Sequence, residues 1–272
     1  MTPSSRLSGL RDHDPIARRA LVARAAGLDP AVLGAFEPTD GLTLSQADHM
    51  VENVVGLIGI PVGIATNFRI DGVDRLVPMA TEEPSVVAAA SNAARMARQT
   101  GGFVTSSTGE VMTAQVQVLD AVDPEGTRLR LLEARDELLA LADAQDPLLV
   151  SLGGGAVDIT ARTLPTRTGV HVILHLHVDV RDAMGANAVN TMAEALAPRI
   201  AEIAGARTLL RILTNKADRR LTRARALFSA DALGGAQVVA DIEVASAFAE
   251  ADAYRAATHN KGIMNGISAV VL

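Results

Sequence analysis

The chain has 272 residues, a formal net charge of −6 and aromatic side chains at only 2% of its positions. The acidic balance argues against nucleic acid as a partner, and the absence of cysteine removes disulfides, thiolate nucleophiles and thiolate-held metal centres. The N-terminal residues carry charges where a signal peptide needs an apolar run, and no uncharged stretch is long enough to span a bilayer, so we expect a cytoplasmic protein without a membrane segment.

The first hundred residues predict helices and one hairpin. A helix over 16–26 stops at Gly27, and a second helix runs from an N-cap at about Ser45 to Val55. In "NFRIDGVDRLV", Asp71-Gly72 supplies the positive φ of a tight primed turn between two strands.

The stretch "TEEPSVVAAASNAARMARQTGGF" (81–103) predicts a helix that begins at Pro84 and ends at Gly101-Gly102. Its first turns are apolar nearly all round, which is typical of a buried helix. A buried charge needs a partner, so the carboxylates of Glu82-Glu83 require explanation. The other unexplained charge is Lys261, in "YRAATHNKGIMNG" (254–266), which we expect to be partly buried. We therefore pair Lys261 with this acidic helix start, as an inference from need.

The middle of the chain predicts the split order βαββαβ, which is ferredoxin-like. The expected strands and helices are, in order, 113–122 (strand), 127–143 (helix), 156–164 and 169–180 (strands), 186–205 (helix) and 207–213 (strand). The fold class we expect is α+β, a large mainly helical domain with this domain inserted. Residues 1–110 form the N-terminal helices and first part of the large domain, 111–216 the inserted domain, and 217–272 an incomplete, helical continuation of the large domain.

Three patterns leave alternatives open. In "HVILHLHVDV", His171, His175, His177 and Asp179 share one strand face, which is either a polar outer face or part of a metal site with ligands from elsewhere. In "VDVRDAMGAN", a glycine turn before a helix is either a plain β–α turn or a phosphate site. The basic run 219–228 is either a solvated helix face or a site for an anionic ligand.

Several blocks, taken in order, closely resemble class II hydroxymethylglutaryl-CoA reductase, the bacterial type. They are "ENVVG" (52–56), "EEPSVVAAAS" (82–91), "SLGGG" (151–155), "DVRDAMGANAVNTMAEALAP" (179–198), "RILTN" (211–215) and "YRAATHNKGIMNG" (254–266). The resemblance implies an NAD(H)-dependent interconversion of 3-hydroxy-3-methylglutaryl-CoA and mevalonate plus CoA by two hydride transfers. It also implies a homodimer, or a higher oligomer built from dimers, and no metal.

The resemblance assigns site residues one by one. Glu83 matches the catalytic glutamate, and Lys261 matches the lysine that stabilises the developing oxyanion. Ser85, Arg255 and Asn265 match positions that hold the hydroxymethylglutaryl group, and Arg11 matches a contact to the CoA phosphates. Asp146 matches the acid that receives the adenine ribose, whose charge would repel a 2′-phosphate and favour NADH. The remaining cofactor positions are Asp182, Met184, Gly185, Asn187 and Asn215.

The resemblance also predicts what this chain lacks. An aspartate and a flap histidine expected after Lys261 would lie beyond Leu272, and the chain stops on an uncapped apolar run. The expectation is therefore a truncated form that is inactive alone. Two other functions stay open at this stage: a non-catalytic remnant that binds CoA or NAD or pairs with a full-length subunit, and a metal-dependent hydrolase built on the histidine face.

Overall fold

The computed structural model describes residues 4–37 and 41–272, and the chain divides into two compact units. Unit 1 joins the residues up to Thr105 with Ala224–Leu272, and unit 2 is Ser106–Arg223. The sequence-based division places the inserted domain at 111–216. Residues 1–3 and 38–40, which belong to the predicted region 1–110, lie outside the described residues.

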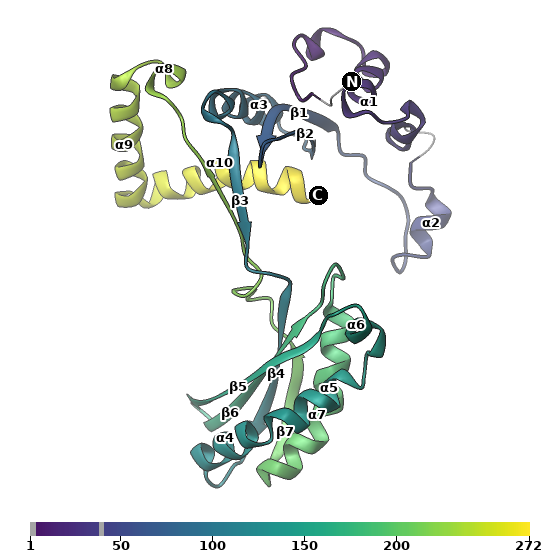
Figure 1. The fold of residues 1–272 in the computed structure, drawn as a ribbon, viewed down its shortest axis with the longest axis vertical. Coiled ribbons are helices and arrows are strands. Elements are labelled where there is room, and N and C mark those ends of the chain that lie inside the picture. The colour runs from purple at the N-terminus through teal and green to yellow at the C-terminus, as the bar shows by residue number, and fades with distance from the viewer. Residues whose placement is uncertain (1–3, 38–40) are drawn as a thin grey trace. The chain divides into compact units, whose positions relative to one another are not determined.

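Unit 1 is built on a mixed four-stranded sheet with the strand order β2-β1-β3-β8. Figure 1 labels its strands β1, β2 and β3. Its elements are η1 Leu10–Asp12, α1 Pro15–Ala26, η2 Pro30–Phe36, α2 Leu44–Asp48, β1 Val62–Ile70, β2 Val73–Ala80, α3 Val86–Ala97, η3 Arg98–Thr100, β3 Phe103–Ser107, β8 Thr222–Ala226, α8 Ala230–Leu233, α9 Ala236–Ala251 and α10 Ala253–Val271. Its small core is made by Ala65, Met79 and Ala269, so α10 packs on the β1–β2 hairpin.

Local sequence signals explain part of unit 1. Helix α1 ends at Gly27 in the left-handed conformation, as predicted. The hairpin turn is also confirmed, because Asp71 and Gly72 both have positive φ, at 49° and 79°. The helix predicted from Ser45 to Val55 is wrong in start and length: α2 begins after Thr43, which forms a capping box with Gln46, and ends at Asp48.

The basic run 219–228 is also different from its prediction. It forms strand β8, which lies beside β3, and not a helix face. Just before it, the carbonyl of Leu221 accepts a hydrogen bond from the backbone of Thr108. Leu221, Arg223 and Arg225 recur at every second residue, which suits a strand, whereas the run of charge alone suggested a helix. The helical stretch expected after it is present as α8 to α10.

Unit 2 has the order βαββαβ that the sequence predicts, with a sheet ordered β5-β6-β4-β7. Its elements are β4 Val111–Leu119, α4 Pro124–Glu133, α5 Arg135–Asp143, α6 Pro147–Ser151, β5 Gly155–Thr166, β6 Gly169–Asp179, α7 Ala186–Ala204 and β7 Arg207–Leu213. The single helix predicted over 127–143 is two helices that meet at Ala134, and the short helix α6 was not predicted.

The core of unit 2 lies between one face of the sheet and the helices, as Figure 1 shows. Alternate residues of β6, from Val172 to Val180, are fully buried against Leu131, Leu138 and Leu196 of the three covering helices. The residues that alternate with the histidines of β6 therefore form its buried face. No helix in the described part of the chain is both long and apolar enough to cross a membrane.

Candidate active site

The pair Glu83 and Lys261 forms an ion pair although 178 residues separate the two in the chain. The Lys261 Nζ lies 2.5 Å from Glu83 Oε2, and the two side chains are 59% and 43% exposed. The predicted contact is present, but the predicted burial of the lysine and of the carboxylate is wrong. An ion pair this exposed contributes at most about 1 kcal/mol to stability, so its geometry matters more to chemistry than to folding.

Two elements bring these side chains together. Glu83 lies in the turn between β2 and α3, where its backbone N–H donates to Thr81 Oγ1 at 3.1 Å. Lys261 lies near the middle of α10, and Ala269, two turns later, is buried against the β1–β2 hairpin. The packing of α10 on this hairpin therefore sets the position of the lysine beside the turn.

The start of α3 differs from the prediction. The helix begins at Val86, and Pro84 lies outside it in the turn. Ser85 occupies the N-cap position with φ 73°, a left-handed conformation that is uncommon for a residue other than glycine. Such conformations persist where the surrounding structure imposes them, and they cluster at functional sites.

The alanine-rich face of α3 was expected to be buried, and this expectation is wrong for most of its residues. Only Ala94 and Ala97 are buried, whereas Ala88 and Ala89 are exposed. Ala88 belongs to a side of the helix that borders an open pocket of about 1290 Å³. The α3 residues that line the pocket are Ser85, Val87, Ala88, Ser91, Asn92 and Arg95.

The opposite wall of this pocket comes from the N-terminal segment and β1. It combines apolar side chains with cations, among them Leu10, Val22, Phe36, Ile64, Arg11, Arg18 and Arg19. Arg11 and Ser85, two predicted substrate-binding residues, therefore line the same pocket. Sequence reasoning missed Arg95, although Ser91, Asn92 and Arg95 recur at the spacing of one helix face.

The other two predicted substrate residues lie on α10. Asn265 follows Lys261 by four residues and so lies on the same face of the helix, where it is half-buried. Arg255 lies near the start of α10, where Asp252 caps the helix by accepting a hydrogen bond from the Arg255 N–H at 2.6 Å. The structure thus brings Asn265 onto the face of Lys261 and leaves Arg255 nearly two turns away from that lysine.

The predicted cofactor residues of unit 2 lie on loops at one end of its sheet. The loop after β6 and the "SLGGG" loop are joined, because the Arg181 guanidinium donates to the carbonyl of Gly153. Gly185 precedes α7 with φ 87°, and a Cβ atom there would lie 2.7 Å from Met112 Sδ and from Val180 Cγ1. Only glycine fits this turn, so the backbone lies close against the sheet at the start of α7.

The remaining cofactor residues surround this turn. Three of them, Asp182, Met184 and Asn187, are exposed. Asn215 follows the end of β7, and this end is fixed to α7 because the Leu213 N–H donates to Asn190 at 2.9 Å. Asp146 precedes α6, and its carboxylate accepts a hydrogen bond from the Leu149 N–H at 2.9 Å. Helix α6 leads directly into the "SLGGG" loop. Exposed side chains beside the open start of a long helix suit a phosphate-containing cofactor.

The histidine face of β6 is a hydrogen-bonded polar surface. The His177 ring lies between the hydroxyls of Thr113 and Thr160 at 2.9 and 3.0 Å, and His175 lies 3.0 Å from the Gln115 amide. Burial lowers the pKa of His177 to about 4, with Arg219 contributing in the same direction. Among residues 4–37 and 41–272, no group of three or more His, Asp or Glu side chains is placed to hold a metal ion. The hydrogen bonds account for this face as a polar layer.

Comparison with known proteins gives the family. The family model for hydroxymethylglutaryl-coenzyme A reductase matches residues 15–272. The chain belongs to this reductase family. A 3-hydroxy-3-methylglutaryl-coenzyme A reductase of Archaeoglobus fulgidus is 53% identical over 269 residues, which cover 99% of this chain and 62% of that relative. A probable reductase of Borreliella burgdorferi is 32% identical over 233 residues, covering 82% of this chain and 52% of the relative.

Solved reductase structures share the fold. A 3-hydroxy-3-methylglutaryl-coenzyme A reductase of Streptococcus pneumoniae superposes with a TM-score of 0.92 at 36% identity, covering 97% of this chain and 72% of that one. A class II reductase from the same organism, bound to NADPH in open conformations, gives 0.91 at 35% identity, covering 97% and 73%. The predicted resemblance to the class II reductases is therefore confirmed, and the chain spans about three fifths of the length of the Archaeoglobus reductase.

Proposed function

We propose that this chain carries the substrate pocket and the cofactor domain of a reductase that interconverts 3-hydroxy-3-methylglutaryl-CoA and mevalonate plus CoA. The observation that carries the proposal is the Glu83–Lys261 ion pair, which lies beside Ser85 at the start of the pocket-lining helix α3. An acid and a cation held 2.5 Å apart are the two groups that reduction of a carbonyl requires.

The reaction balances as one thioester, two reduced nicotinamide cofactors and two protons giving one alcohol, one thiol and two oxidised cofactors. The bound cofactor supplies the hydride for each step. The Lys261 ammonium stabilises the negative charge that develops on the carbonyl oxygen when the carbon accepts hydride. The Glu83 carboxylate takes the proton of the hydroxyl group in the oxidative direction and returns it to the oxygen in the reductive direction. Ser85, Asn265 and Arg255 orient the hydroxymethylglutaryl group.

The large pocket of unit 1 is the proposed site for the CoA portion of the substrate. Its apolar wall suits the pantetheine chain, and the guanidinium groups of Arg11, Arg18 and Arg95 suit phosphate groups. Arg11 is 95% exposed at its side chain and lies 3.5 Å from the Asp12 carboxylate, an exposed contact that a bound phosphate can replace.

The cofactor proposal is NADH in preference to NADPH. The residues of unit 2 fit a dinucleotide, because Gly185 gives close backbone approach at the start of α7 and Asp146 offers a carboxylate nearby in sequence to the "SLGGG" loop. A carboxylate accepts hydrogen bonds from a ribose but repels a 2′-phosphate. We expect Asp146→Asn, which keeps the helix cap, to reduce the ratio of NADPH to NADH dissociation constants, as measured by calorimetry. An unchanged ratio would contradict the assignment.

A homodimer is part of the proposal. Helix α9 exposes Val238, Val239, Ile242 and Phe248, an apolar surface that a second copy would cover. The absence of cysteine suits a reducing, cytoplasmic location.

The proposed function is tested by binding and by turnover. Calorimetry with hydroxymethylglutaryl-CoA should give saturable binding to the wild-type chain. Where mevalonate-dependent reduction of NAD+ is measurable, Lys261→Met lowers the rate at least about a hundredfold, because an oxyanion donor is lost. Lys216→Met changes the only other lysine of the chain and serves as the matched control. Absent binding, or full turnover by Lys261→Met, would refute the proposal.

A further inference from the structure

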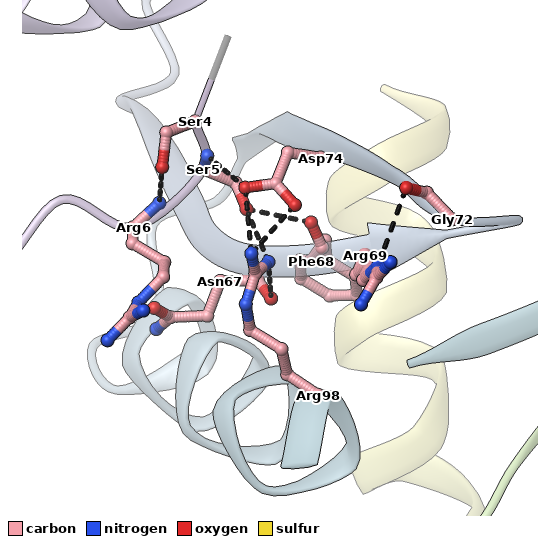
Figure 2. A network of polar contacts seen from close by, with 9 residues as sticks. All are labelled: Ser4, Ser5, Arg6, Asn67, Phe68, Arg69, Gly72, Asp74 and Arg98. Carbon is pink, nitrogen blue, oxygen red and sulfur yellow. Dashed lines mark hydrogen bonds and ion pairs between the residues drawn. The ribbon is translucent and has the colours of Figure 1, made fainter. Parts of the chain in front are cut away.

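One residue, Ser5, makes the hydrogen bonds between the N-terminal segment, residues 4–37, and the rest of unit 1. Within the described residues, every hydrogen bond between this segment and the remainder of the unit involves Ser5 (Figure 2). The Ser5 N–H donates to Asp74 Oδ2 at 2.9 Å, and its carbonyl accepts from the Asn67 N–H at 2.8 Å. Its hydroxyl donates to the carbonyl of Phe68 at 2.8 Å.

The groups that receive Ser5 are themselves fixed. Arg98, just after α3, donates to Asp74 at 2.8 Å, to the Ser5 hydroxyl at 3.2 Å and to the carbonyl of Asn67 at 3.4 Å. Asp74 starts β2, and Asn67 lies at a bulge of β1 with φ 68°. One arginine therefore ties together β1, β2 and the N-terminal segment, as the dashed lines of Figure 2 show. We call Ser5, Asp74 and Arg98 the N-terminal clasp.

The residues of the clasp are largely buried, so their hydrogen bonds and ion pair are stronger than the same contacts on an exposed surface. Ser5 is only 1% exposed, and the side chains of Asp74 and Arg98 are 15% and 23% exposed. Desolvation would raise the pKa of Asp74, but the hydrogen bonds from Ser5 and Arg98 outweigh it, so the pKa lies below its usual value. The carboxylate is therefore charged at neutral pH, and the bonds it accepts are charge-assisted.

Ser5 of the clasp lies on the N-terminal segment, which forms one wall of the large pocket. The segment that follows Ser5 contributes four residues to the lining of the pocket: Leu10, Arg11, Arg18 and Arg19. The facing wall is formed by α3 and β1. Arg98 directly follows α3, and Asn67 lies within β1. The width of the pocket and the position of its cations thus depend on where Ser5 is held.

We propose that Ser5, Asp74 and Arg98 are positioning residues for the CoA pocket: the N-terminal clasp holds the arginine-bearing wall against β1 and α3. The inference rests on the proposed function for the identity of the ligand, but the mechanical role of the clasp is independent of it. None of the three residues touches the proposed reacting groups, so the clasp affects binding of the CoA portion and leaves the chemistry of Glu83 and Lys261 unchanged.

The test compares two matched pairs of variants. Asp74→Ala removes the carboxylate of the clasp, and Asp71→Ala removes a carboxylate of the same hairpin that bonds to Thr105 instead. Ser5→Ala removes the clasp hydroxyl, and Ser4→Ala removes the neighbouring hydroxyl, whose contact is the Arg6 N–H. Ser5→Ala removes fewer contacts than Asp74→Ala. The comparison of Ser5→Ala with Ser4→Ala therefore remains informative if Asp74→Ala lowers the overall stability.

Three quantities are measured on the purified chain. Asp74→Ala should weaken CoA binding about tenfold by calorimetry, since it removes charge-assisted hydrogen bonds that orient the wall. Amide hydrogen exchange should speed up within residues 6–37 and stay unchanged in unit 2. The affinity for NADH, whose proposed site lies in unit 2, should stay within twofold of the wild type, a split that general destabilisation would not give.

The outcomes separate the two levels of the inference. Equal exchange and equal CoA affinity in Asp74→Ala and wild type would overturn the clasp, as would equal effects of the Ser4 and Asp71 controls. A wild-type chain that does not bind CoA would refute the proposed function and the ligand of the pocket. Faster exchange in Asp74→Ala would then still identify the clasp, so the two failures are distinguishable.

Discussion

The glycine before α7 gives a prediction whose size follows from the space around it. In Gly185→Ala, the new Cβ meets Met112 and Val180 atoms at 2.7 Å, and the residue keeps φ 87°. A non-glycine residue in the left-handed region costs about 1 kcal/mol, and overpacking adds roughly 1–3 kcal/mol. We expect Gly185→Ala to destabilise unit 2 by roughly 2–4 kcal/mol.

The matched control is at the other end of the same helix. Gly205 caps the C-terminus of α7 with φ 60°, and a Cβ added there meets nothing within 4 Å. Gly205→Ala should therefore show only the conformational term of about 1 kcal/mol. The chain has no tryptophan, so unfolding is followed by circular dichroism and by amide exchange at Leu174 in the core of unit 2. Equal losses in the two variants would refute the steric argument.

Three further predictions follow from burial and charge. Leu196→Ala leaves a cavity in the core of unit 2 and should lower its free energy of unfolding by about 3–5 kcal/mol, measured by urea denaturation. Lys261→Ala should change the unfolding free energy of unit 1 by less than about 1 kcal/mol, because its ion pair is exposed; a larger loss would show that the lysine is structural. His177, whose pKa is lowered from 6.5 to about 4, should keep a neutral ring by NMR at pH 5. Because the unfolded chain takes up this proton first, unit 2 should lose stability as the pH falls from about 6.5 to about 4, and His177→Gln should flatten that slope.

The sequence predicts the inserted βαββαβ order because its elements are long and strongly periodic. The alternation in β6 and the glycine caps of α1 and α7 are local signals that tertiary contacts do not override. The predictions fail where the signal is short or ambiguous. The basic run before α8 has only a short period-two pattern, which its charges obscured, and the strand that it forms lies beside β3.

The candidate site was predictable in part. Need for a counter-charge paired Lys261 with the acidic pair Glu82-Glu83, and the family resemblance singled out Glu83. The same reasoning predicted burial that the ion pair does not have. The apolar face of α3 was taken for a core surface, since sequence does not distinguish a helix that faces a pocket from one that faces the interior. Ser5 and Arg98 gave no sequence signal at all, because a serine and an arginine 93 residues apart reveal their bond only in the folded chain.

The strand order of unit 1 bears on how its chain could be rearranged. Unit 2 leaves unit 1 after β3 and returns through β8, and these strands are neighbours in one sheet. For unit 1, the whole insertion is a loop whose two ends are already together, and the free energy of closing a loop grows only with the logarithm of its length. A short turn between β3 and β8 could therefore replace unit 2 without disturbing the sheet, and the excised unit would keep its core, since β4 to β7 and their helices are contiguous in sequence. For unit 1, unit 2 is thus an insertion between two neighbouring strands of one sheet.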